Sequence, residues 1–302
     1  MVRLISPLQE KLPVSVVVLT FNEERHIEDC LRSVAAWAGE VHVVDSGSTD
    51  GTLDIVACYT EKIASHPFET YSRQRNWAQE NLPLSCDWIL HVDADERISP
   101  ELAASIHRFF STGQDRNFNG AMLARRTVFM GRWIRHGGHY PVFHMRLYRR
   151  DRGRCEDRNY HQHFIVPPPV TRLQGDLIDI VASELDMFSL RHIRWIGEEA
   201  NELSGSRTDE PGQVPPKLMG DPIARRRWLR NNAYGKSPLF VRAFALFVYR
   251  YIVRLGFLDG TEGLIFHFLQ GCWSPFLIDA KIWEAKRGAR VRSAALEEES
   301  VP

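Results

Sequence analysis

Two carboxylates at the end of an apolar run are the residues of this sequence best suited to chemistry. Asp93 and Asp95 follow directly after the nearly continuous apolar run at residues 88–92. Such a run is typical of a parallel strand covered on both faces, and ligands of open α/β sheets bind beyond the carboxyl ends of such strands. Because side chains alternate along an extended chain, both carboxylates can point the same way. With phosphate oxygens they can ligate a hard divalent cation, Mg²⁺ or Mn²⁺.

The same stretch also fits a purely structural role. Ser99-Pro100-Glu101 is typical of a helix start, because serine caps helices and proline suits their first turn. Asp95 or Ser99 would then cap a helix, and the carboxylates would bind no metal. Both interpretations are open from these residues alone.

The segments before the two carboxylates alternate between strand and helix signals. Apolar or β-branched runs predict strands, and apolar residues three or four positions apart predict amphipathic helices. Strands are predicted at residues 14–19, 40–44, 61–65 and 88–92, and helices at about residues 25–37, 53–59 and 73–81. This β-α-β-α order indicates an α/β fold with a parallel, right-handed, doubly wound sheet.

Polar, acid-bearing loops end the first, second and fourth predicted strands. The second of these loops, residues 45–52, begins with Asp45 and is rich in glycine and capping residues. A bound nucleotide needs acceptors for its base and ribose, backbone donors for its phosphates, and a cation. Asp45 can serve the base or ribose, or it can be a turn residue that accepts from its own backbone. The glycine-rich fingerprint of dinucleotide proteins is missing, which argues against a nicotinamide-dependent dehydrogenase.

Four motifs in this order resemble the family 2 glycosyltransferases. They are Val-Val-Val-Leu-Thr-Phe-Asn-Glu-Glu at 16–24, Val-Asp-Ser-Gly-Ser-Thr-Asp-Gly-Thr at 44–52, Gln-Arg-Asn-Trp-Ala at 74–78 and Asp-Ala-Asp-Glu at 93–96. More narrowly, the chain is similar to small bacterial enzymes that build lipopolysaccharide core or exopolysaccharide.

The resemblance implies a GT-A fold, which is a Rossmann-like, mostly parallel doubly wound sheet. It also implies a UDP- or GDP-linked sugar donor and transfer with inversion at the anomeric carbon. By position in the motifs, Asp95 would bind the metal on the diphosphate, Asp93 the ribose, and Arg75 the nucleotide. The motif residues implied to face the nucleoside are Thr20, Asn22, Glu23 and Asp45.

Basic residues are concentrated in the middle of an otherwise neutral chain. Residues 125–158 contain ten arginines and three acids, whereas the whole chain has 38 residues of each sign. The loop at residues 131–138 combines glycines with Trp133, Arg132 and Arg135, so it can place a ring against a sugar and guanidinium groups against phosphates. Arg132 is therefore a candidate donor ligand. A solvated basic face is the alternative interpretation.

Transfer with inversion requires a general base that removes the proton of the acceptor hydroxyl. Many family 2 enzymes have a Glu-Asp pair after the metal motif, and Glu156-Asp157 resembles it. Related core transferases carry His-Glu where this chain has His161-Gln162, and a glutamine cannot act as a base. Asp157 is the favoured base, and Glu156, His161 and His163 are the alternatives. Asp157 can instead pair with a neighbouring arginine and order its loop.

The C-terminal part has the pattern of helices at a membrane surface. Residues 239–258 are apolar and aromatic except for Arg242, Arg250 and Arg254, which fall within roughly 120° of a helix at about 100° per residue. Three charges make a spanning helix costly, and the next apolar piece, residues 264–282, is interrupted by glycine and proline. We expect an interfacial patch that binds anionic headgroups. The alternative is a buried helical pair that covers the sheet.

The sequence therefore predicts four segments. Residues 1–120 form the nucleotide-sugar-binding half of a GT-A domain, and residues 121–205 form its acceptor-binding and catalytic half. Residues 206–285 form a helical, membrane-facing region, and residues 286–302 form a flexible charged tail.

The predicted function is that of an inverting glycosyltransferase of the hexosyltransferase type. Its acceptor is expected to be lipid-linked or a lipopolysaccharide or exopolysaccharide. The balanced charge gives no indication of nucleic acid binding, and the five cysteines lack metal or disulfide spacing. Because residues 1–13 lack the apolar core of a signal peptide, we expect a cytoplasmic enzyme peripheral to the inner face of the plasma membrane. Two other functions use the same residues: a nucleotidyltransferase, and a catalytically silent sugar-nucleotide-binding protein.

Overall fold

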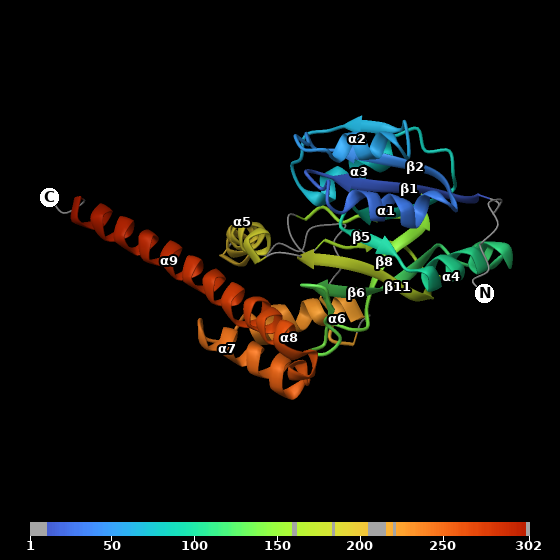
Figure 1. The fold of residues 1–302 in the computed structure, drawn as a ribbon. Coiled ribbons are helices and arrows are strands. Elements are labelled where there is room, and N and C mark those ends of the chain that lie inside the picture. The colour runs from blue at the N-terminus through green and yellow to red at the C-terminus, as the bar shows by residue number, and fades with distance from the viewer. Residues whose placement is uncertain (1–10, 159–161, 183–184, 205–215, 220–221, 300–302) are drawn as a thin grey trace. The chain divides into compact units, whose positions relative to one another are not determined.

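The chain divides into two compact units in the computed structural model (Figure 1). One unit comprises residues 1–128 and 139–181, and the other comprises residues 129–138 and 182–302. The structure describes residues 11–158, 162–182, 185–204, 216–219 and 222–299.

Four parallel strands form the first half of the sheet in the first unit, in the order β3-β2-β1-β4. The strands are β1 (Leu12–Thr20), β2 (Ala38–Asp45), β3 (Ile63–Ser65) and β4 (Trp88–Asp93). The helices that alternate with them are α1 (Ile27–Ala35), α2 (Thr52–Ala57) and α3 (Tyr71–Asn81). The predicted β-α-β-α order is confirmed in type and sequence, with element ends shifted by a few residues.

Beyond β4 the sheet continues in the order β8-β6-β11-β5, in which β4 pairs with β8, β8 with β6, and β11 with β5, all antiparallel. The elements are β5 (Glu96–Ile98), α4 (Pro100–Ser111), a 3-10 turn η1 (Gln114–Asn117), β6 (Gly120–Phe129), β8 (Val142–Arg149) and β11 (Val170–Ala182). A separate pair consists of β9 (Arg154–Cys155) and β10 (Phe164–Ile165). The sheet is therefore mixed, with its parallel part confined to the first four strands.

Strand β1 is covered on both faces, as its apolar sequence predicts. Val14, Val16 and Val18 pack in one buried cluster with the apolar side chains of α1. Val17 and Leu19 point to the other face, where they share a second cluster with Ala78 of α3 and Tyr148 of β8. Because successive side chains of a strand alternate between faces, this arrangement holds the carboxyl ends of β1, β2 and β4 side by side.

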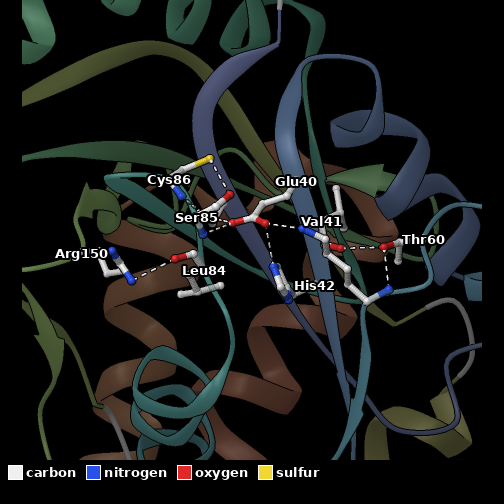
Figure 2. A network of polar contacts seen from close by, with 10 residues as sticks. Glu40, Val41, His42, Thr60, Leu84, Ser85, Cys86 and Arg150 are labelled. Atoms are coloured by element: carbon white, nitrogen blue, oxygen red, sulfur yellow. Dashed lines mark hydrogen bonds and ion pairs between the residues drawn. The ribbon is translucent and has the colours of Figure 1, made fainter.

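A buried carboxylate, Glu40 of β2, joins several segments of the first unit (Figure 2). Its Oε1 accepts from the Ser15 hydroxyl at 2.5 Å and from the Ser85 backbone N–H at 2.6 Å. Its Oε2 contacts the ammonium group of Lys62 and lies 3.1 Å from His42 Nε2. Burial alone would raise the pKa of Glu40, but these hydrogen bonds hold that pKa well below its ordinary range. The charged carboxylate thus stabilises the junction of β1, β2 and the chain before β4.

Glu40→Gln should lower the free energy of unfolding at pH 7 by about 1–3 kcal/mol, because donors such as Lys62 and Ser15 lose an ionised partner. A carboxylate whose folded pKa is depressed adds stability above its unfolded pKa, and this is lost as pH falls towards the folded pKa. The difference between wild type and variant should therefore shrink below about pH 4. Urea unfolding at pH 7 and at a pH below about 4 measures the difference in free energy of unfolding. Glu61→Gln, at an exposed neighbouring residue, is the control. An equal difference at both pH values would contradict the assignment.

Among its described residues, the second unit contains the short strand β7 (Arg132–Trp133) and is otherwise built of helices and the segments that connect them. Its α-helices are α5 (Leu185–Ser204), α6 (Pro222–Leu229), α7 (Val241–Val248), α8 (Gly260–Phe268) and α9 (Ser274–Glu299). π-Helical turns η2 (Arg230–Tyr234), η3 (Tyr249–Val253) and η5 (Leu269–Trp273), and the 3-10 turn η4 (Gly256–Asp259), connect or extend them. Helix α5 packs against α9, and α7 packs against η5. Among the residues that the structure describes, none of the helices combines the length and apolar character needed to cross a bilayer.

Two C-terminal expectations require correction. The apolar piece at residues 264–282 is helical throughout, because the π-helical turn at Leu269–Trp273 precedes Pro275 and accommodates a residue that lacks an N–H. Residues 286–299, expected to be a flexible tail, continue α9, and alanine, glutamate, lysine and arginine in this segment are strong helix formers. Residues 300–302 lie outside the described part.

The predicted basic glycine loop, residues 131–138, belongs to the second unit. His136 Nδ1 lies 2.6 Å from Asp259 Oδ1, and its backbone N–H donates to Asp259 Oδ2 at 2.9 Å. Gly137 adopts a φ of 69° and packs so closely on His267 that a Cβ would lie 2.0 Å from its ring. Only glycine suits both constraints. The loop is therefore anchored to the helices of this unit.

Candidate functional site

A cluster of four buried or half-buried charged side chains lies at the carboxyl end of β4. The Arg75 guanidinium donates to both oxygens of Asp93, at 2.8 and 2.9 Å. Arg146 Nη2 donates to Asp93 Oδ2 at 3.0 Å and to Glu96 Oε1 at 2.7 Å. Glu96 Oε2 accepts from the Asp93 backbone N–H at 2.9 Å. Two arginines and two acids thus fix the turn that follows β4.

The surroundings of the two acids shift their pKa values in opposite directions. Burial would raise the pKa of Asp93, but Arg75 and Arg146 hold it well below its ordinary range. Burial raises the pKa of Glu96 to about 8, and Asp93 adds to this while Arg146 opposes it. Burial would lower the pKa of Arg146, yet both acids keep it above its ordinary value. Asp93 is therefore firmly ionised and held in one orientation.

Asp95, the predicted metal ligand, is half-buried at this turn, and its carbonyl accepts from the Ile180 N–H at 3.0 Å. The neighbouring Asp93 accepts from two guanidinium groups, so its carboxylate is already used to hold this turn. Within the described ranges no group of three or more His, Cys, Asp or Glu side chains could hold a metal. A cation at Asp95 would therefore need ligands from outside the protein, such as diphosphate and water, which Mg²⁺ commonly keeps.

The loops after β1 and β2 are joined by side chains of the first two motifs. Asn22 Oδ1 accepts from the Thr49 N–H at 2.7 Å, and the Asn22 N–H donates to the Ser48 hydroxyl at 2.9 Å. The Glu23 N–H donates to Thr52 Oγ1 at 2.8 Å. Asn22 adopts a φ of 54°, a conformation that asparagine tolerates better than most residues. These residues shape the rim at the strand ends, as well as being candidates for donor binding.

Asp45 and Thr20, which pair in register at the ends of β2 and β1, differ in their surroundings. Asp45 Oδ2 accepts from the backbone N–H groups of Gly47 and Ser48, at 2.9 and 3.0 Å. Asp45 thus accepts hydrogen bonds from the backbone of its own loop, which is the turn role that the sequence left open as an alternative. Thr20 Oγ1 is buried and makes no hydrogen bond with any residue that the structure describes.

Helix α3 positions the segment that carries the predicted base. Asn76 exchanges two hydrogen bonds of 2.9 Å with the Cys155 backbone, donating from Nδ2 and accepting at Oδ1. The Ser72 hydroxyl donates to the Arg158 carbonyl at 2.9 Å. Gln79 donates to the carbonyls of Arg150 and Gly153, both at 2.8 Å. Since Arg75 lies on the same helix, α3 connects this segment to the charged cluster.

The candidate bases lie in different environments. Glu156 is buried, and its Oε1 accepts from the His163 N–H at 2.8 Å. Asp157 is exposed, and it is close enough to Arg73 to raise the pKa of that guanidinium, after the larger effect of Glu69. His161 lies outside the described residues. Exposure makes Asp157 the more accessible carboxylate of the pair, while Glu156 shapes the loop.

Much of the basic run at residues 125–158 is paired inside the first unit. Arg126 lies 3.1 Å from Asp176, and Arg125 lies 3.6 Å from Asp179. Arg149 donates to the carbonyls of Asp115 and Phe118. Arg132, the predicted donor ligand, lies in the second unit 3.7 Å from Glu262. Several guanidinium groups of this run therefore stabilise the fold through ion pairs and hydrogen bonds. The alternative interpretation, a solvated basic face, applies only to the rest of the run.

Sequence reasoning missed several residues of the site. Arg146 and Glu96 complete the charged cluster, and Gln74 Nε2 donates to the Ser46 hydroxyl at 3.2 Å while its Oε1 lies 2.7 Å from His66 Nδ1. Gln74 and Glu96 fall inside quoted motifs, so their positions carried a signal. Arg146 carried only a weak signal, as one cation in an alternating strand.

Comparison with known proteins agrees with this geometry. Residues 15–164 match the family model described as glycosyl transferase family 2. The lipopolysaccharide core biosynthesis glycosyltransferase LpsC of Rhizobium meliloti is 30% identical over 162 residues, 52% of this chain and 58% of LpsC. An uncharacterized glycosyltransferase of Rickettsia bellii is 40% identical over 104 residues, 34% of this chain and 35% of that protein. The matches span less than two thirds of each relative.

Among solved structures, S. aureus TarS 1–349 in complex with UDP is similar over 91% of both chains, with a TM-score of 0.45 and 18% identity. The family match covers all four motifs, and the motif residues converge on one edge of an α/β sheet. Residues 15–164 belong to glycosyltransferase family 2, and the first unit, which holds most of them, has the α/β sheet expected of the GT-A fold.

Proposed function

We propose that this glycosyltransferase moves a sugar from a UDP- or GDP-linked donor, with inversion, to a lipid-linked or polysaccharide acceptor. The single observation that carries the proposal is the Arg75–Asp93–Arg146–Glu96 cluster beside Asp95, at the strand ends where nucleotides bind in α/β sheets. The similarity to LpsC supports an acceptor of the lipopolysaccharide or exopolysaccharide type. Such an acceptor favours an enzyme that is cytoplasmic and peripheral to the inner membrane face.

The donor would bind along the rim made by the first two motif loops. Asp93, ionised and fixed by two arginines, is suited to accept hydrogen bonds from the ribose hydroxyls. Around the nucleoside, the proposed contacts are Thr20, Asn22, Glu23 and Asp45, with Arg132 as a further donor ligand. Their polar groups can discriminate a nucleotide because an unmatched buried polar group is costly.

A divalent cation would be held by Asp95. When bound, it supplies positive charge that stabilises the departing nucleoside diphosphate. Arg75 and Arg146 each use Nη2 to orient Asp93. Arg75 is also a proposed contact of the nucleotide, because its Nε makes no hydrogen bond with any residue that the structure describes.

The acceptor hydroxyl would lose its proton to Asp157, with Glu156 and His161 as the next candidates. The exposure of Asp157 and the hold of α3 on the preceding Cys155 support this order. A nucleotide-sugar panel in a nucleoside diphosphate release assay tests the function. Pyrophosphate release would instead indicate a nucleotidyltransferase. Donor binding without turnover, and without slow hydrolysis of the donor, would indicate a catalytically silent sugar-nucleotide-binding protein. That function is an alternative because this chain has Gln162 where related transferases have a glutamate.

Asp95→Asn should abolish transfer and sharply weaken metal-dependent nucleotide binding, because an amide ligates a divalent cation poorly. The fold should persist, since Asp95 is half-exposed at a turn. Nucleotide titrations with and without Mn²⁺, together with a melting curve, measure both effects. Asp151→Asn, at an exposed turn, is the matched control. Unchanged turnover in folded Asp95→Asn protein would remove the metal-ligand assignment.

Arg146→Lys should keep the charge but lose the fork that reaches Asp93 and Glu96 together, so Asp93 loses its fixed orientation. We expect turnover to fall at least about tenfold, with weaker donor binding. Steady-state kinetics over a donor series measure this, and Arg152→Lys, exposed beside Asp151, is the control. The assignment fails if Arg146→Lys melts like wild type and retains full turnover.

Asp157→Asn should melt like wild type, bind nucleotide normally and transfer at least about a hundredfold more slowly, since only the base is lost. A loop-ordering role predicts instead a lower melting temperature or weaker donor binding. Single-turnover rates and nucleotide affinity distinguish the two roles. Near wild-type turnover would exclude Asp157 and direct attention to Glu156 and His161.

A further inference from the structure

The helix formed by α7 and the π-helical turn η3 exposes an entirely apolar or aromatic stripe. Six large side chains of this stripe are each 48–63% exposed, and they recur every three or four residues: Val241, Phe244, Val248, Tyr249, Ile252 and Val253. The following turn adds three more exposed apolar side chains, Leu255, Phe257 and Leu258. A helix of a water-soluble protein normally turns such a stripe towards the core.

The buried side of the same helix carries its charge. Arg242 is buried, donates from Nε to Asp279 Oδ1 at 2.7 Å, and lies over the ring of Tyr234. Asp279 is fully buried and also accepts from the Phe240 N–H at 2.7 Å. This ion pair fixes the rotation of the helix, so that its apolar residues point outward. The expectation that Arg242 contacts lipid headgroups is therefore wrong, because that guanidinium is buried in an ion pair with Asp279.

The chain around this stripe is strongly basic. Residues 222–258 contain eight arginines or lysines and no aspartate or glutamate, whereas the whole protein has no net charge. Four of these cations are exposed: Arg225, Arg226, Lys236 and Arg254. Asp259, the first acid after this stretch, is buried against His136. Of these exposed cations, Arg254 ends η3 and therefore lies next to the apolar stripe.

We infer that this face, α7–η3–η4, inserts into one leaflet of an anionic membrane. The apolar side chains would enter the headgroup and acyl boundary, and the exposed Arg254 beside them would bind an anionic headgroup. Charge complementarity selects lipid over a second copy of the chain, because two copies would bring equal basic surfaces together. The inference rests on the proposed function in one respect: membrane binding would bring the enzyme to a lipid-linked acceptor.

Flotation with vesicles of phosphatidylcholine and phosphatidylglycerol tests the inference. Wild type should float at low salt, and it should remain in solution with pure phosphatidylcholine vesicles or at high salt. Val248→Asp combined with Ile252→Asp should weaken binding at least about tenfold, because both side chains lie outside the core. Arg254→Gln should weaken it about fivefold.

Leu190→Asp, at an exposed apolar residue of α5 in the same unit, should bind vesicles like wild type. Binding that survives the double substitution, or is equal with neutral vesicles, would overturn the inference. So would a lipid-free dimer, seen by sedimentation, that the double substitution dissociates. Nucleoside diphosphate release without lipid should be unchanged in the double variant, so a failed membrane inference stays distinguishable from a failed proposed function.

Discussion

The candidate site depends on burying two carboxylates close together at the end of β4. Burying both is costly, because ionised carboxylates repel strongly in a medium of low polarity and each loses its hydration. Burial and Asp93 accordingly raise the pKa of Glu96 to about 8, whereas Asp93 stays ionised. Arg75 and Arg146 offset that cost, and they come from elements on different sides of the turn: α3 precedes β4, and β8 pairs beside it. The antiparallel half of the sheet is therefore required by the site as well as by packing, since β8 supplies the second guanidinium.

The sequence predicted the parallel strands and their helices because their patterns are local. A run such as Val14–Leu19 must be buried wherever it lies, and the motif acids follow directly from strand ends. Arg146 could not be assigned in this way. Its partners lie about fifty residues earlier in the chain, and one arginine in an alternating strand has the same pattern whether it faces solvent or a buried acid. Long-range pairing is invisible to local periodicity.

The same limit explains the C-terminal differences. The helical spacing of Arg242, Arg250 and Arg254 was a sound local signal, but the rotation of the helix depends on Asp279, 37 residues beyond Arg242. Residues 286–299 are charged and polar, which suggested a tail, yet their intrinsic helix propensity and continuity with the preceding turns of α9 were sufficient for helix formation.

The hold of α3 on the segment before the candidate base is made through backbone atoms of that segment. Asn76 contacts the N–H and carbonyl of Cys155, and Ser72 and Gln79 contact other carbonyls. In these contacts the held segment contributes backbone atoms, although the side chain of Asp157 also lies near Arg73 of the same helix. Evolution can therefore replace the side chains around Glu156 and Asp157 to suit a new acceptor, while the loop keeps its place. Substrate range and structural integrity are separable here, which favours diversification of acceptors on one unchanged donor site.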